Sequence, residues 1–145
     1  MPIYAVSRAR SQLSTTADTL TIVASSTKPL RIIMCKVAGA DAAPADNTVL
    51  LMKSTGGTGP GTAITPTPIA GNSTASFAVY TTWSGQPTPG AILHRFEPNA
   101  NGGIDPFVAV PGGEYSVPVS GQVSLRSERG TSNVVPNLLI EEVEG

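Results

Sequence analysis

The sequence is poor in charge, in cysteine and in aromatic residues. Only 13% of its 145 residues are charged, where about 25% is usual for a globular domain. The formal net charge is −1, so the chain lacks the strong positive field that draws nucleic acid. Because Cys35 is the single cysteine, no disulfide can form within the chain. The single cysteine leads us to expect folding in a reducing compartment. The low net charge leads us to expect no nucleic-acid partner.

Long apolar runs are missing as well. No stretch approaches the roughly 20 apolar residues of a membrane-spanning helix, and residues 1–10 lack the basic-then-apolar pattern of a signal peptide. We expect no membrane partner.

The chain is rich in short segments in which apolar and polar residues alternate, separated by Gly, Pro, Asn and Ser clusters. This pattern predicts about eight short β-strands and no long helix. Many short strands with Gly- and Pro-rich turns are typical of a sandwich or barrel. We predict one all-β domain over residues 1–145, an antiparallel β-sandwich, with an eight-stranded jelly roll as the best match at this length. The expected strands lie within 18–25, 29–38, 47–53, 74–83, 91–97, 105–110, 114–119, 121–128 and 134–145.

The expected strand at 29–38 differs from the others because it is apolar on both faces. Strict alternation directs Leu30, Ile32 and Met34 to one side, and it directs Ile33, Cys35 and Val37 to the other. A strand with two apolar faces is typical of one covered on both sides. We expect the second cover to be another subunit.

Residues 55–71 read TGGTGPGTAITPTPIAG and carry no charge. A phosphate-binding loop would need Lys and then Ser or Thr after its last glycine, but Thr62 and Ala63 follow Gly61. A solvated linker would not need the two isoleucines, and the prolines favour an extended conformation. We expect an extended loop over about 54–73 that contacts a partner, with a plain exposed loop as the alternative. The expected contact residues are Ile64, Pro66, Pro68 and Ile69.

The first quarter of the chain is basic. Arg8 and Arg10 lie in residues 1–17, which carry no acid and which we expect to form an N-terminal arm. Exposed cations of this kind can steer a protein onto an oppositely charged surface. We expect the two arginines to contact a partner, with solvated strand faces as the alternative.

Residues that could support catalysis or bind a metal are few and scattered. His94 is the only histidine, and it lies far from Cys35 in the sequence. Neither residue has metal-ligand spacing, and a cysteine in an apolar strand is usually an inert buried thiol. The acids form no pair with the spacing of a recognised site. We therefore expect no enzyme activity, no metal and no cofactor.

The order of motifs resembles the small β-sandwich virion proteins of tailed phages, chiefly capsid decoration (cement) proteins. The resemblance rests on KPLRIIMCKVA, LLMKSTGGTGPGTAITPTPIAG, VPGGEYSVPV and LLIEEVEG. It implies a non-enzymatic protein, made in the host cytoplasm, that binds the major capsid protein on the outside of the assembled head and stabilises it. It also implies a homo-oligomer, with a trimer favoured.

Two other functions stay open at this point. One is another virion structural role, in the tail or in head–tail joining. The other is a carbohydrate-binding module, in which Trp83, Tyr80 and Tyr115 would form a platform of rings on one exposed face.

Overall fold

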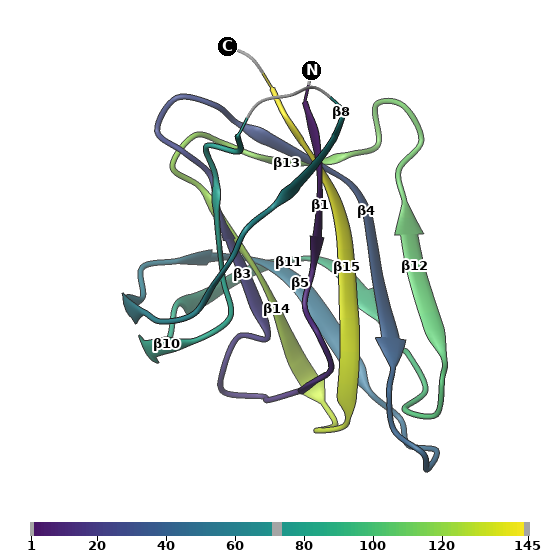
Figure 1. Cartoon of the computed structure of the whole chain (residues 1–145). Helices are drawn as coiled ribbons and strands as arrows, with labels where there is room; N and C mark the ends of the chain where they lie inside the picture. The colour runs from purple at the N-terminus through teal and green to yellow at the C-terminus, as the bar shows by residue number, and fades with distance from the viewer. Residues whose placement is uncertain (1, 71–73, 144–145) are drawn as a thin grey trace.

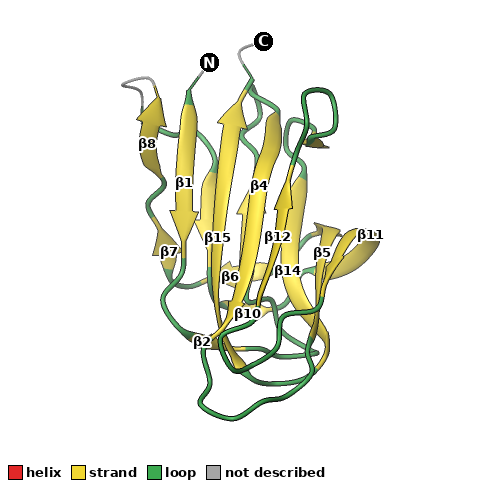
Figure 2. Cartoon of the chain, turned by 90° about the vertical axis from the view of Figure 1, so that its right-hand side faces the viewer, coloured by secondary structure: helices red, strands yellow, loops and turns green. Residues whose placement is uncertain are grey.

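A computed structural model describes residues 2–70 and 74–143, and these residues form β-strands and loops with no helix. Figures 1 and 2 show the strands gathered into two layers that face each other. The expected all-β, antiparallel β-sandwich is therefore confirmed. The strands are β1 Ile3–Ser7, β2 Ser11–Gln12, β3 Leu20–Val23, β4 Leu30–Gly39, β5 Thr48–Thr55, β6 Thr58–Pro60, β7 Ala63–Ile64, β8 Thr67–Ala70, β9 Ala78–Tyr80, β10 Trp83–Gly85, β11 Thr88–Phe96, β12 Ile104–Val108, β13 Tyr115–Val117, β14 Gln122–Arg129 and β15 Asn133–Glu142.

The two layers are antiparallel sheets, here named sheet A and sheet B. Sheet A has the order β12-β4-β15-β1-β8, with β13 also paired to β4 and β2 to β15; sheet B has the order β11-β5-β14-β3-β9-β7. Eight of the strands divide evenly between the layers, with the neighbour order β1-β15-β4-β12 in sheet A and β3-β14-β5-β11 in sheet B. This order supports the jelly roll, which stays a prediction.

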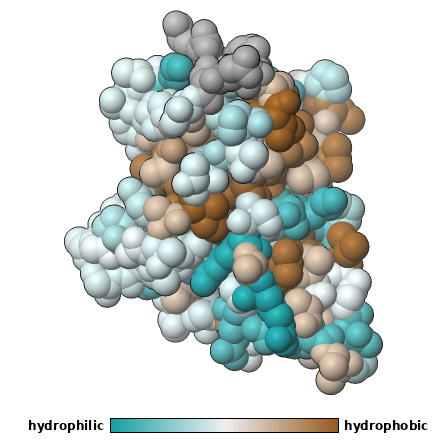
Figure 3. Space-filling model, viewed as in Figure 1, coloured by the Kyte–Doolittle hydropathy of each residue, from teal (hydrophilic) through white to brown (hydrophobic). Residues whose placement is uncertain are grey.

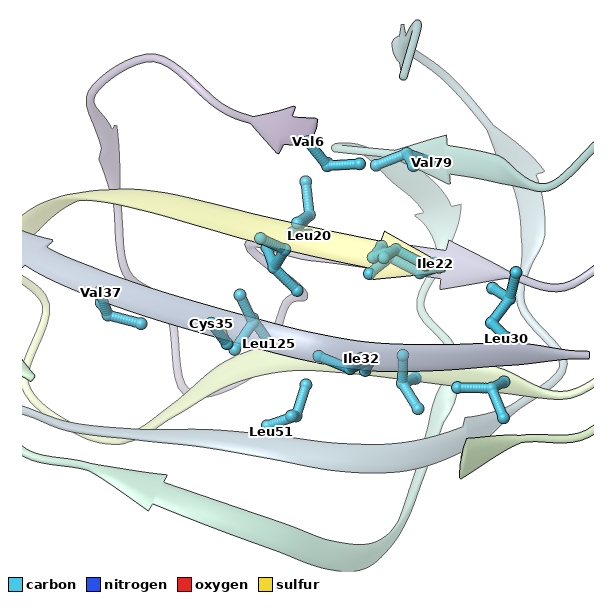
Figure 4. Close-up of a cluster of buried hydrophobic side chains, with 14 of the residues drawn as sticks. Val6, Leu20, Ile22, Leu30, Ile32, Cys35, Val37, Leu51, Val79 and Leu125 are labelled. Carbon is cyan, nitrogen blue, oxygen red and sulfur yellow. The ribbon is translucent and has the colours of Figure 1, made fainter. Parts of the chain in front are cut away.

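The core lies between the sheets and is built by alternation within each strand. In β14, Val123 and Leu125 point inward and are buried, and in β5 Val49 and Leu51 do the same. Figure 4 shows side chains from both sheets meeting in this layer, including Leu20, Ile32 and Leu125. Burial of such side chains is the main source of stability in a fold of this kind.

Strand β4 contains a β-bulge that alternation alone did not predict. Met34 pairs with Leu139 and Ile32 pairs with Ile140, so Ile33 is an extra residue on β4. A bulge of this kind shifts the inward register by one residue. Leu30, Ile32, Cys35 and Val37 are therefore all buried in one core, while Ile33 and Met34 are half-buried. The expectation that strict alternation puts Cys35 opposite Ile32 was wrong.

The thiol of Cys35 is buried in this core, and burial changes its pKa and its reactivity. Cys35 is buried, and desolvation raises its pKa from the ordinary 9.0 to about 12. We expect native protein to resist alkylation by iodoacetamide at pH 8.5, and urea-unfolded protein to react readily, as measured by mass spectrometry. Between about pH 9 and 12 the unfolded thiol ionises while the folded thiol stays protonated, so this group's contribution to stability is lost as pH rises. Rapid alkylation of folded protein would contradict this prediction.

The N-terminal residues form part of sheet A and are not a free arm. Strand β1 pairs with β15 on one side and with β8 on the other. Tyr4 and Val6 of β1 are fully buried in the core, and β2 pairs with β15 through Gln12 and Asn133. The arm expected over about 1–17 is corrected accordingly, because its apolar residues alternate with the period of a strand.

Candidate functional site

The Gly- and Thr-rich segment that follows β5 folds back onto its own chain. Its first part, β6, pairs with β10 as a separate two-stranded ribbon, with Pro60 opposite Trp83 and Thr58 opposite Gly85. We name residues 56–62 and 82–87 together the strap. Figure 1 shows β10 well to the side of the strands of sheet A. The strap connects the β5–β11 pair, where Thr88 lies opposite Thr55, to the β7–β9 pair, where Ala63 lies opposite Tyr80.

The glycines of the strap are required by close approach between its two chains. A Cβ at Gly59 would lie 2.0 Å from the Ser84 hydroxyl, and one at Gly85 would lie 2.3 Å from the Thr58 hydroxyl. Gly57 has φ +95° and packs under the Trp83 ring. The glycine spacing that suggested a phosphate loop thus serves chain-to-chain packing.

A buried polar network lies on the outer face of sheet B, next to the strap. Arg126 of β14 contacts the Asp18 carboxylate through Nη2 at 2.7 Å and Nε at 2.9 Å. The two side chains are only 10% and 1% exposed. Asp18 also accepts hydrogen bonds from the hydroxyls of Thr21, at 2.6 Å, and Ser124, at 2.5 Å. A buried charge pair needs such additional hydrogen bonds to offset its desolvation.

The same network holds the strap in place. Arg126 donates to the Pro87 carbonyl at 3.1 Å, and the Trp83 indole N–H donates to the Thr21 hydroxyl at 3.0 Å. The Asp18 backbone N–H donates to the Gln86 side chain at 3.0 Å. The strap is therefore anchored to sheet B by buried and partly buried hydrogen bonds and covers part of its outer face.

The expected contact residues of the extended loop follow the strap and fall on two sheet edges. Ile64 lies in β7, is half-buried and packs against the core. Pro66 is half-buried between β7 and β8, and Pro68 lies exposed in β8 opposite Tyr4. Ile69 is 56% exposed. The segment thus joins the edge of sheet B to the edge of sheet A, and residues 71–73 lie outside the described part of the chain.

The two arginines expected to contact a partner are already engaged within the molecule. Arg8 is half-buried and donates to the Thr19 carbonyl at 2.5 Å and to the Thr81 carbonyl at 3.4 Å; burial lowers its pKa. Arg10 is exposed and pairs with Asp41 at 3.0 Å. Hydrogen bonds from Asn133, together with Arg10, lower the pKa of Asp41. Of the two, Arg10 is the more exposed, and contact of either arginine with a partner stays a prediction.

The outer face of sheet A carries apolar side chains, some exposed and others half-buried. One row across the strands consists of Val108, Met34, Leu139 and Ala5, which pair in register. A second row contains Ile104, Ala38 and Val135. Ile104 and Val108 are 63% and 66% exposed. Figure 3, which views this face, shows brown apolar residues separated by teal polar ones.

Three edge strands of the sandwich carry a proline. These are Pro68 in β8, Pro106 in β12 and Pro89 in β11. Proline cannot donate a backbone hydrogen bond, and natural proteins use it at sheet edges to prevent unwanted strand pairing. These edges are therefore poor surfaces for adding a strand.

The three rings named in the carbohydrate hypothesis lie in two separate aromatic clusters. Tyr80 and Trp83 pack edge to face with centroids 5.3 Å apart, beside sheet B. Tyr115 packs on Phe107 at 4.7 Å, and its hydroxyl lies 3.1 Å from His94 Nδ1. The platform of Trp83, Tyr80 and Tyr115 required by the carbohydrate hypothesis is not formed, because Tyr115 belongs to a strand paired with sheet A.

Comparisons with known proteins add no assignment to this geometry. No protein-family model, no curated protein and no solved structure matches the chain. Within residues 2–70 and 74–143, no three His, Cys, Asp or Glu side chains are grouped so that they could hold a metal ion. Nor does the described part of the chain contain a helix that could cross a membrane.

Proposed function

We propose that this chain is a capsid decoration protein: it binds the major capsid protein on the outer surface of an assembled phage head and stabilises the head. The observation that carries this proposal is the group of apolar side chains on the outer face of sheet A. Ile104 and Val108 are exposed there beside the apolar row through Met34 and Leu139. Exposed apolar surface of this kind marks a protein–protein contact.

The contrast between the two faces of the sandwich supports this assignment. Part of the outer face of sheet B is covered by the strap and its buried network, and three edge strands carry prolines. The outer face of sheet A is therefore the apolar surface available to a permanent partner. A protein that binds only the assembled shell stabilises that state by mass action.

Self-association belongs to the same proposal. We favour a homotrimer on the virion surface, in which this face is shared between neighbouring copies and the shell. Permanent interfaces of this type bury roughly 2,000 Å² or more and resemble a core cut in half. The function requires no enzyme activity, metal or cofactor.

A second candidate is another virion role, in the tail or in head–tail joining, because the same apolar face would serve any permanent assembly contact. Immunogold labelling of virions distinguishes the two: label on the head supports decoration, and label on the tail supports the alternative. The carbohydrate module loses support, since its three rings lie in two clusters.

Charged substitutions on the outer face of sheet A test the proposal. We expect Ile104→Glu combined with Val108→Glu to weaken co-sedimentation with expanded shells at least about tenfold, because burying an unpaired carboxylate opposes docking. Both side chains are exposed, so unfolding should change by no more than about 0.5 kcal/mol. Val119→Glu is the matched control, since Val119 is exposed but lies between β13 and β14. If the double variant and the control bind shells equally well, the outer face of sheet A is not the shell-binding surface.

Light scattering of the unmodified protein tests the homotrimer by measuring its mass in solution.

A further inference from the structure

A groove opens at one end of the sandwich, between β13 and the ends of β5 and β14. It consists of two hollows of about 190 and 340 Å³, which share Lys53, Ser116, Val117 and Pro118 in their walls. Because they share one wall, the hollows adjoin along β13. Figure 1 shows β13 near the end of β15. A ligand that fills both hollows must therefore be elongated.

The wall of the groove contains basic side chains and no acidic ones among the described residues. Lys53 lines both hollows, and Arg31 lines the larger one. Arg31 pairs with Glu141 at 3.4 Å, but Lys53 is exposed and forms no salt bridge in residues 2–70 and 74–143. Lys53 is thus a cation available to a carboxylate on a ligand.

The floor of the groove is apolar. Pro118 is exposed and lines both hollows, whereas the lining residues Leu30, Val117 and Val123 are no more than 1% exposed, so Pro118 supplies accessible apolar surface. A ligand that pairs with Lys53 can therefore also place an apolar side chain on this floor. Carboxylate and apolar groups side by side are typical of a peptide with alternating acidic and apolar residues.

Strand β13 adds backbone hydrogen-bonding groups to the groove. It pairs with β4 on one side only, within the described residues. The smaller hollow has Ser116 and Val117 of β13 on one wall and residues of β5 and β14 on the other, and no β4 residue lines it. Unlike β8, β11 and β12, β13 has no proline within its bounds. An extended peptide can add to such an edge through main-chain hydrogen bonds, with side-chain pockets supplying specificity.

From these observations we infer that the groove between β13 and β5 binds an extended acidic segment of a partner protein. The segment adds as a strand to β13, places a carboxylate on Lys53 and rests an apolar side chain against Pro118. This binding mode does not depend on shell binding or on the outer face of sheet A, so it can be tested on the isolated protein.

The experiment is an amide chemical-shift titration of the full chain with an acetylated, amidated Val-Glu-Val-Glu-Val peptide at low salt. We expect saturable shifts at Ser116 and Val117. Lys53→Ala should weaken binding about tenfold, because one charge-assisted hydrogen bond is lost. Lys36→Ala should leave affinity unchanged, since Lys36 is an equally exposed lysine of β4 that does not line the groove.

Three further probes separate the parts of the inference. The Val-Gln-Val-Gln-Val peptide should bind at least about tenfold more weakly, and a backbone N-methylated acidic peptide should not bind, because it cannot pair with β13. Sodium acetate should not reproduce the shifts at the same concentrations. The inference is overturned if acetate shifts the same amides equally, if the two unmodified peptides bind alike, or if Lys53→Ala behaves as Lys36→Ala does.

Discussion

Replacing Arg126 with Met is expected to lower the free energy of unfolding by about 3 to 5 kcal/mol. The substitution leaves the Asp18 carboxylate, whose side chain is 1% exposed, without its cation. It also removes the hydrogen bond to the Pro87 carbonyl that fixes one end of the strap. For a chain of this length, the loss corresponds to a fall in Tm on the order of 10 °C.

The control for this prediction is Arg95→Met. Arg95 lies 3.6 Å from Glu128, and the two side chains are 57% and 47% exposed, so the loss should be below about 1 kcal/mol. Urea unfolding of both variants measures the difference. Fluorescence of the single tryptophan, Trp83, reports in addition whether the strap detaches before the sandwich unfolds. If the two variants unfold at the same urea concentration, the buried network does not secure the strap.

The sandwich was predictable from the sequence because most strands are amphipathic. Strand β14 buries Val123 and Leu125 on one side, and its polar residues alternate with them. Where alternation fails, the reason is local geometry. The bulge at Ile33 changes which residues of β4 point inward, and nothing in the letters LRIIMCKVA distinguishes a bulged strand with one apolar face from a regular strand with two.

The strap and its network were not predictable from residue types alone. Asp18 and Arg126 are 108 positions apart in the sequence, and no motif links them. A signal was nevertheless present: Arg126 lies in the middle of the strand between Leu125 and Ser127, where a charged side chain needs a partner if it is buried. The glycines at 57, 59 and 85 are likewise typical of close packing between chain segments. The sequence does not show which segment packs against them, because the three-dimensional fold determines that.

The prediction of an N-terminal arm was wrong because residue types alone did not show which strands would pair with this segment. IYAVS is too short to be distinguished from an extended arm by its alternation, and the basic SRAR that follows suggested exposure. In the structure, Tyr4 contributes a fully buried ring that packs edge to face on Phe77 at 5.4 Å. The pairing of β1 with both β15 and β8 therefore makes it an inner strand of sheet A.

Removal of residues 1–7 is accordingly expected to abolish cooperative folding, whereas removal of a free arm would leave the sandwich intact. The deletion removes the strand that pairs with both β15 and β8, and it empties the space filled by Tyr4 and Val6. Truncation is tolerated only where the backbone is neither buried nor hydrogen-bonded.

A point variant makes the same test where the deletion cannot be purified. Tyr4→Ala should cost about 3 to 5 kcal/mol, through lost burial and the cavity left behind. Ile3→Ala is the matched control in the same strand, because Ile3 is only half-buried and lies opposite Glu141. Its effect should be clearly smaller, since less apolar area returns to water. Urea unfolding followed by circular dichroism measures both. A sandwich that retains its unfolding midpoint after Tyr4→Ala would show that β1 is an accessory strand and would restore the N-terminal arm.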